Sequence, residues 1–134
     1  MKNLKKVLAL VLVVAMMASF AVSAGAASFT DNAKIVYNDA VKLLSNLDVI
    51  NGFTDGSFNP KGNVTRAQTA KMIAYIMNGG EDASSTFAAS AKFNDVANGY
   101  WAANSIGYCA TKEIVAGAGN NLYYPNNDVT GVQL

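Results

Sequence analysis

The sequence has no histidine and only one cysteine, Cys109, among its 134 residues. These absences exclude a cysteine–histidine zinc cluster, a histidine general base and a disulfide formed within one chain. Charged residues are also scarce, at 14%, and ten basic residues nearly balance nine acidic ones. No excess of charge therefore points to nucleic acid as a partner. Hydrophobic residues make up 51%, and they are unevenly spread.

Apolar residues collect at the N-terminus. Three lysines precede an uncharged run over residues 7–22, which is shorter than the roughly 20 residues that cross a bilayer core. Ala24 and Ala26 then supply the A-x-A pattern at which signal peptidase cleaves. The pattern predicts a signal peptide over residues 1–26, a mildly acidic exported chain and no stable membrane span. A retained N-terminal anchor is the alternative.

An internal repeat organises the rest of the chain. Residues 50–69 align without gaps with residues 115–134, and self-similarity at a fixed spacing is typical of repeat architectures. The paired positions hold glycines, aromatics, prolines and capping residues in the same order: Gly52 with Gly117, Phe58 with Tyr123, Pro60 with Pro125, Thr65 with Thr130 and Gln68 with Gln133. We expect repeats over 27–78 and 93–134, joined by a linker at 79–92 that is rich in Gly, Ser and Ala.

Each repeat is expected to consist of a helix, a loop and a second helix, so the predicted fold class is mainly α. Apolar residues at three- and four-residue steps predict a first helix near residues 32–47. The turn dipeptide Asp55-Gly56 and Pro60 predict a compact loop, with Phe58 inserted into the core.

The second helix is predicted from its caps. Thr65-Arg66-Ala67-Gln68 has the form of a capping box, and Asn78-Gly79-Gly80 is a typical stop. Its apolar residues predict the buried face: Ala67, Ala70, Ile73, Ala74 and Met77.

The second repeat is expected to be incomplete. A first helix is predicted around Ile106, followed by a loop over 115–129. After the cap at Thr130 only residues 131–134 follow, about one helical turn. Stacked repeats generally need about three units, so a third unit is expected to be missing. The chain is then either part of a longer gene product or a short protein that completes itself by oligomerising.

These motifs resemble the S-layer homology (SLH) repeat of bacterial surface proteins. The first unit carries the resemblance through Phe29-x-Asp31, Val49–Phe53, Asp55–Pro60 and Val64–Gln68. The second carries it through Phe93–Val96, Trp101, Ile114–Gly117, Tyr123–Pro125, Val129 and Thr130. The family's Thr-Arg-Ala-Glu signature is kept at three of four positions by Thr65–Gln68. In the second unit only Thr130 is kept, and Gly131 replaces the arginine.

The resemblance implies a noncovalent wall anchor outside the cell that binds and does not catalyse. Three such repeats would form a three-pronged pseudo-trimer, whose grooves hold an anionic, often pyruvylated, secondary cell-wall polysaccharide. Other SLH repeats or S-layer subunits are the further partners implied. No cofactor or metal is expected, and Cys109 is interpreted as a buried structural residue.

Five residues are the predicted polysaccharide contacts. Arg66 offers a guanidinium fork beside the positive end of a helix dipole, both suited to a carboxylate. By family analogy, Gly52 lets a sugar approach the backbone, and Trp101 offers a flat face for a pyranose ring. Thr65 and Gln68 are interpreted first as helix caps and second as ligand contacts. Each of three residues also has a purely structural interpretation: Arg66 as a solvated surface residue, Gly52 as a turn glycine and Trp101 as a core residue.

The same residues give little support to a calcium site or to an enzyme active site. The loop does not match the calcium-binding loop of an EF-hand. With Gly56 as the sixth loop residue, the third is Phe53 and the twelfth is Gly62, and neither side chain can ligate calcium. No pair of catalytic carboxylates is evident. Two alternatives to a wall anchor stay open: a structural S-layer lattice subunit, and the anchor of a secreted polysaccharide-degrading enzyme whose catalytic domain lies beyond Leu134.

Overall fold

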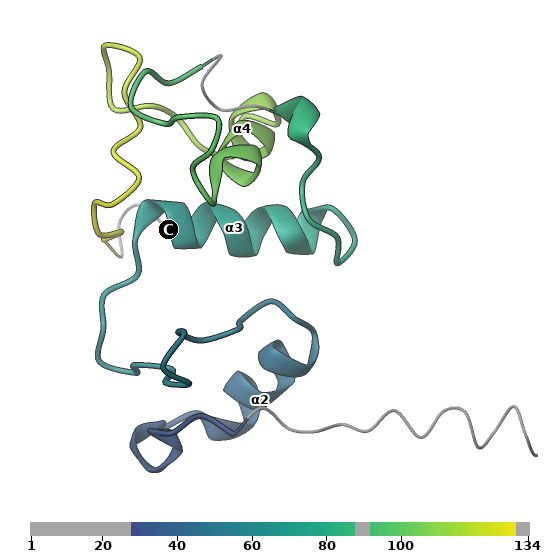
Figure 1. Cartoon of the computed structure of the whole chain (residues 1–134), viewed down its shortest axis with the longest axis vertical. Coiled ribbons are helices and arrows are strands. Elements are labelled where there is room, and N and C mark those ends of the chain that lie inside the picture. The colour runs from purple at the N-terminus through teal and green to yellow at the C-terminus, as the bar shows by residue number, and fades with distance from the viewer. Residues whose placement is uncertain (1–27, 88–91, 131–134) are drawn as a thin grey trace, which may run out of the picture.

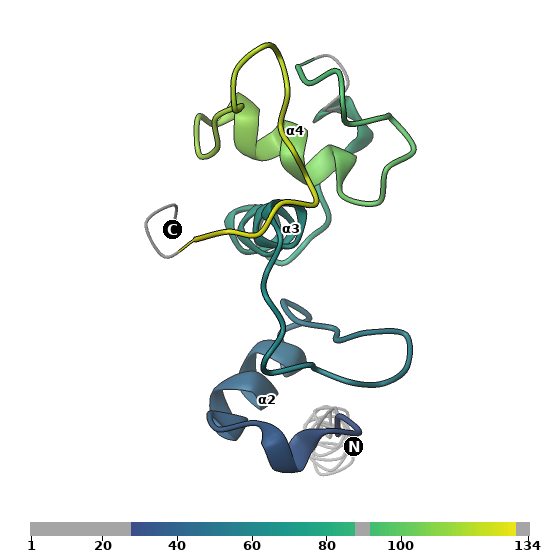
Figure 2. The ribbon, with the colours of Figure 1, turned by 90° about the vertical axis from the view of Figure 1, so that its left-hand side faces the viewer.

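The computed structural model describes residues 28–87 and 92–130, and its regular structure in these ranges is helical. The elements are two short 3-10 helices and three α-helices: η1 (Asn32–Lys34), α2 (Asn38–Asn46), α3 (Arg66–Met77), η2 (Ser85–Phe87) and α4 (Ala103–Thr111). Figures 1 and 2 show α3 between α2 and α4. The prediction of a mainly α fold is confirmed.

Two parts of the prediction fall outside these ranges. The expected signal peptide, residues 1–26, and the start of a second helix at residues 131–134 are not among the described residues. Across 28–87 and 92–130, no helix combines the length and apolar character needed to cross a membrane.

The first predicted helix, residues 32–47, is broken and shorter than expected. Ile35 follows η1 with extended backbone (φ −84°, ψ 113°), and α2 begins only at Asn38. Because of this break, the Ile35 side chain packs in a small buried cluster. Its burial there outweighs the helical hydrogen bonds that are lost. Five apolar residues form this cluster: Phe29, Ile35, Val41, Ile50 and Phe58.

Helix α3 begins and ends where its caps predicted. The Thr65 hydroxyl accepts from the Gln68 backbone N–H at 3.3 Å, and the Gln68 side-chain oxygen accepts from the Thr65 N–H at 2.8 Å. Both halves of the capping box are therefore present. At the other end Gly79 has a left-handed φ of 75°, and the Gly80 N–H closes the helix on the Tyr75 carbonyl at 2.9 Å.

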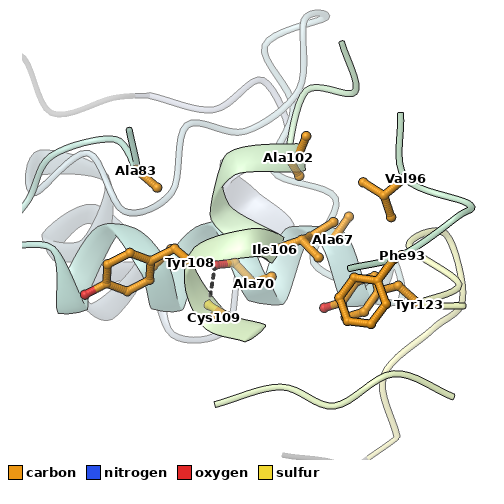
Figure 3. Packing of buried hydrophobic residues seen from close by; sticks show 12 residues of the cluster. Ala67, Ala70, Ala83, Phe93, Val96, Ala102, Ile106, Tyr108, Cys109 and Tyr123 are labelled. Atoms are coloured by element: carbon orange, nitrogen blue, oxygen red, sulfur yellow. Dashed lines mark hydrogen bonds between the residues drawn. The ribbon is translucent and has the colours of Figure 1, made fainter. Parts of the chain in front are cut away.

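The larger core crosses the predicted boundary between the repeats. Helix α3, from the first repeat, packs on α4, from the second, through Ala67, Ala70 and Ala74, which are all fully buried. Such small residues let two helices approach closely, and Figure 3 shows aromatic rings filling both ends of the contact. Met77, expected on this buried face, is instead 60% exposed.

The remaining core contacts explain the lone cysteine and the predicted linker. Cys109 is fully buried, and its thiol donates to the Ala70 carbonyl at 3.5 Å (Figure 3). Burial raises the pKa of this thiol to about 11, so it stays protonated at neutral pH and acts as a packing residue. In the predicted linker, η2 packs on α4, and the Phe87 and Tyr108 rings meet edge to face at 5.1 Å.

Helix α2 has no helix packed on it as α3 packs on α4 in the described part of the chain. Its surroundings expose several large apolar side chains: Val36, Tyr37, Leu43 and Leu47. The pseudo-trimer implied by the SLH resemblance would cover such a face with a helix from a further repeat. That arrangement stays a prediction.

Backbone conformation repeats with the same spacing as the sequence. Left-handed φ angles occur at Asp48 and Glu113 (56° and 60°) and again at Asn59 and Tyr124 (57° and 56°). Each pair lies 65 residues apart, the spacing of the sequence alignment. The two units are thus equivalent in the backbone as well as in the sequence.

An aspartate holds the loop of each unit in the same way. The Asp31 carboxylate accepts from the backbone N–H groups of Phe58 (2.9 Å) and Asn59 (2.8 Å). The Asp95 carboxylate accepts from the equivalent pair in the second unit, at 2.8 and 2.7 Å. Two forked hydrogen bonds of this kind fix the start of each repeat against its loop.

The first of these forks predicts an acid-sensitive contribution to stability. The Phe58 N–H, followed by the Asn59 N–H, holds the pKa of Asp31 below its usual 3.8, although partial desolvation opposes the shift. A lowered folded pKa stabilises the fold above the unfolded value, and this stabilisation is lost as pH falls through the folded value. We expect Asp31→Asn to unfold more easily than the parent at pH 7.

Urea unfolding of both proteins from pH 7 to pH 2 measures this effect. The difference between parent and Asp31→Asn should begin to shrink below about pH 4, the pKa of an unfolded aspartate, and should vanish as pH falls through the lower pKa of folded Asp31. A difference that stays constant over the whole range would contradict the assignment.

Candidate functional site

The most polar contact between the two units lies at the N-terminus of α3. We call it the repeat seam and define it by residues 64–68 of the first unit together with Ala116 and residues 123–129 of the second. Thr65 and Asp128 form an antiparallel bridge, with the Val129 N–H donating to the Val64 carbonyl at 2.8 Å. Figure 1 shows the end of the described chain running down to this end of α3.

Arg66 fastens the seam with its side chain. Its Nε donates to the Tyr123 carbonyl and its Nη2 to the Ala116 carbonyl, both at 2.8 Å. The guanidinium carbon also lies 4.3 Å from the centre of the Tyr123 ring, a cation–π contact. Arg66 is the single arginine of the sequence, and it joins residues 50 and 57 positions away.

The guanidinium keeps donors for a further partner. Of its five N–H groups, two are used in these bonds, and three have no partner among the described residues. Arg66 is partly buried, and its plane is held by the two carbonyls and the ring. It therefore presents a fixed, positively charged donor group at the surface of the seam.

The helix N-terminus itself is not available to an anion. The N–H groups of Thr65 and Gln68 are satisfied by the capping box. Those of Arg66 and Ala67 donate at 2.9 Å to the carbonyls of Asn127 and Pro125. Of the two features expected to suit a carboxylate, the helix N-terminus therefore has these four N–H groups already bonded, and the Arg66 side chain is the donor that stays available.

Tyr123 is the residue around which the seam is packed. It is 1% exposed, its ring lies 5.1 Å from that of Phe93, and its hydroxyl donates to the Arg66 carbonyl at 3.1 Å. Burial raises the pKa of the Tyr123 phenol to about 12, although the neighbouring Arg66 charge opposes the shift. The phenol consequently stays protonated and keeps its donor role at any physiological pH.

Three of the five predicted contact residues lie together at the seam, namely Thr65, Arg66 and Gln68. Thr65 and Gln68 are partly buried and bonded to one another as caps. Gly52 lies elsewhere: its neighbours are Phe29 and Ser57 of its own unit. The glycine next to the seam is Gly117, which follows the carbonyl of Ala116 that binds Arg66.

Trp101 is exposed and does not belong to the core. Its residue is 57% exposed and precedes α4, which begins at Ala103. Its ring lies 5.7 Å from that of Tyr100, whose hydroxyl donates to the Asn126 side chain at 2.9 Å. Tyr100 thus connects Trp101 to residues 123–129 of the seam.

Sequence reasoning missed the seam residues Ala116 and Tyr123. The pairing of Tyr123 with Phe58 predicted a core aromatic, but nothing in the sequence showed that its carbonyl would accept from Arg66. A groove of about 410 Å³ also lies beside the seam and was not foreseen. It is lined by Gly62, Asn63, Val64, Thr69, Met72, Ile73 and Val129.

Comparison with protein families matches residues 28–70 and 92–133 to the S-layer homology domain. A cell surface protein of Thermoanaerobacter kivui is 35% identical over 140 aligned residues, covering 99% of this chain and 18% of the relative. An exoglucanase XynX of Acetivibrio thermocellus is 34% identical over 92 residues, covering 69% of this chain and 8% of the relative. No solved structure matches the chain significantly.

A third relative is named for anchoring. The cellulosome-anchoring protein of Acetivibrio thermocellus is 28% identical over 81 residues, which cover 60% of this chain and 18% of that protein. The chain thus spans less than a fifth of the length of each of these three relatives.

Proposed function

Because the chain belongs to the S-layer homology family and is a cell-surface protein, we propose that its repeats anchor it noncovalently to the bacterial wall by binding an anionic secondary wall polysaccharide. The observation that carries the proposal is the single arginine of the chain, held at the repeat seam with three donors that have no partner within 28–87 and 92–130. A planar guanidinium suits a carboxylate, such as that of a pyruvylated sugar.

The seam reduces the cost of binding because its donor is already ordered. Two carbonyl bonds and the Tyr123 ring fix the guanidinium before any ligand arrives. A preorganised group loses little conformational freedom on binding, so more of its interaction energy appears as affinity. We assign Trp101, 57% exposed, as a platform for a sugar ring.

The other three predicted residues are proposed to act mainly through the fold. Thr65 and Gln68 set the start of α3 and thereby the position of Arg66. Gly52 allows close packing of its loop on Phe29 in the first unit. We propose that the repeats bind and do not catalyse, whether the protein that carries them is an enzyme, a lattice subunit or neither.

Co-sedimentation with purified wall sacculi, before and after removal of the secondary polymer, tests the proposal. The parent should be retained by intact sacculi and released when the polymer is stripped. Arg66→Ala should weaken retention by about tenfold or more, because charge-assisted hydrogen bonds contribute about 1.5–3 kcal/mol.

A second variant separates binding from damage to the fold. Tyr123→Phe removes the hydroxyl that donates to the Arg66 carbonyl but keeps the ring and the guanidinium. It should lose about 1 kcal/mol of stability and keep its retention. Equal retention of Arg66→Ala and the parent, both folded by circular dichroism, would overturn the role of Arg66. Retention that survives polymer removal would instead favour contacts between lattice subunits.

A further inference from the structure

We propose that Tyr124 is a second aromatic contact of the wall polysaccharide, stacking on a sugar ring beside Arg66. The inference rests on the proposed function and names a residue that is not among the five predicted contacts. Three observations on Tyr124 carry it: its backbone conformation, its unpartnered side chain and its place in the seam.

The backbone of Tyr124 is in a conformation that a tyrosine rarely adopts. Its φ of 56° is left-handed, which asparagine and glycine tolerate but bulky residues generally do not. The equivalent position of the first unit holds Asn59 at nearly the same angle, 57°. The fold therefore demands this conformation in both units, and the second unit meets it with a strained residue.

The Tyr124 side chain is only partly used by the fold. The residue is 44% exposed, and its hydroxyl and ring make no hydrogen bond or ring contact within 28–87 and 92–130. The tyrosine thus departs from the usual backbone preference, and within 28–87 and 92–130 no hydrogen bond or ring contact of its side chain offsets the strain. Positions of this kind in natural proteins are typically functional.

The place of Tyr124 supplies the ligand class. The carbonyl before it, of Tyr123, accepts from the Arg66 guanidinium, and the carbonyl after it, of Pro125, accepts from the Ala67 N–H. Its own N–H donates to Asp95 at 2.7 Å. The backbone of Tyr124 is consequently fixed beside the Arg66 side chain. An anionic sugar bound by Arg66 offers an apolar ring face that an aromatic side chain can cover.

Replacing Tyr124 by asparagine, the residue of the first unit, tests the inference. A merely structural tyrosine would lose stability on truncation, whereas a strained ligand contact should lose affinity only. We expect Tyr124→Asn to bind polymer-bearing sacculi about three- to tenfold more weakly, in line with typical aromatic stacking. Its thermal midpoint should equal or exceed that of the parent.

Tyr37→Asn is the matched control, since Tyr37 is an exposed tyrosine near α2 and outside the seam. It should bind like the parent. Equal affinities of Tyr124→Asn and the parent would overturn the inference and leave the anchor function in place. Equal losses in both variants would also overturn it, because the effect would not belong to the seam. A parent that does not bind the polymer at all would overturn both proposals.

Discussion

Tyr123→Ala is expected to lower the free energy of unfolding by about 3–5 kcal/mol, a large part of the 5–15 kcal/mol typical of a domain. The ring is almost fully buried between Phe93 and the Arg66 guanidinium. Its removal leaves a cavity at the seam and removes the packing of Tyr123 on Arg66 that joins the two units. Urea unfolding followed by circular dichroism at 222 nm measures the loss.

Phe58→Ala is the internal control for this experiment. Phe58 occupies the equivalent position of the first unit, where it is only partly buried and packs on Phe29 at 5.5 Å without an arginine above it. We expect a smaller loss than for Tyr123→Ala. Equal losses at the two positions would contradict the account of the seam as the better-packed contact.

Gly52→Ala is expected to cost about 2–4 kcal/mol, by adding left-handed backbone strain to overpacking. Gly52 has a φ of 69°, and an added Cβ would lie 2.5 Å from the Phe29 ring and 2.7 Å from the Ser57 carbonyl. The carbonyl belongs to the backbone and cannot simply rotate away. Thermal unfolding of the variant measures the combined effect.

Two other glycines separate these contributions. Gly79 shares the left-handed φ, at 75°, but has no atom within 4 Å of an added Cβ, and Gly99 has neither feature. Gly79→Ala should therefore lose about 1 kcal/mol and Gly99→Ala almost nothing. Similar losses in all three variants would contradict the packing role of Gly52. If Gly52→Ala were stable but no longer bound sacculi, the original prediction of Gly52 as a ligand contact would be supported instead.

Local features of the fold could be predicted because their causes lie within a few residues. The capping box that begins at Thr65 and the glycines that end α3 each act over one helical turn. The spacing of the two units was also readable, because equivalent loops need the same turn residues. Gly52 with Gly117 and Pro60 with Pro125 show this identity, whereas the shared left-handed backbone of Asp48 and Glu113 could not be read from two different residue types.

The partners of these elements could not be predicted. The apolar stripe of α3 shows that the helix is buried but not that it packs on α4 of the other unit. The break at Ile35 was missed because an apolar side chain can reach the same cluster from helical or extended backbone. Met77 was misplaced because a pattern of apolar residues does not show which of them a neighbouring element covers.

The candidate site was predicted in its residues and missed in its geometry. A capping motif marked Arg66, yet its hydrogen bonds go to carbonyls of Ala116 and Tyr123, far along the sequence. Backbone carbonyls leave no signature in the side-chain pattern. Because Arg66 also holds the two units together, an Arg66 variant can lose stability as well as binding. The Tyr123→Phe control is needed to separate the two effects.

The measurement that tests the central claim most directly is a titration of the ¹⁵N-labelled protein with isolated secondary wall polymer, followed by NMR. The chain has one arginine and one tryptophan, so the Arg66 Nε–H and the Trp101 indole N–H each give one unambiguous signal. The account predicts that both signals shift together and saturate at the polymer concentration that releases the protein from sacculi. Unchanged Arg66 and Trp101 signals at a concentration that releases the protein would contradict binding at the repeat seam.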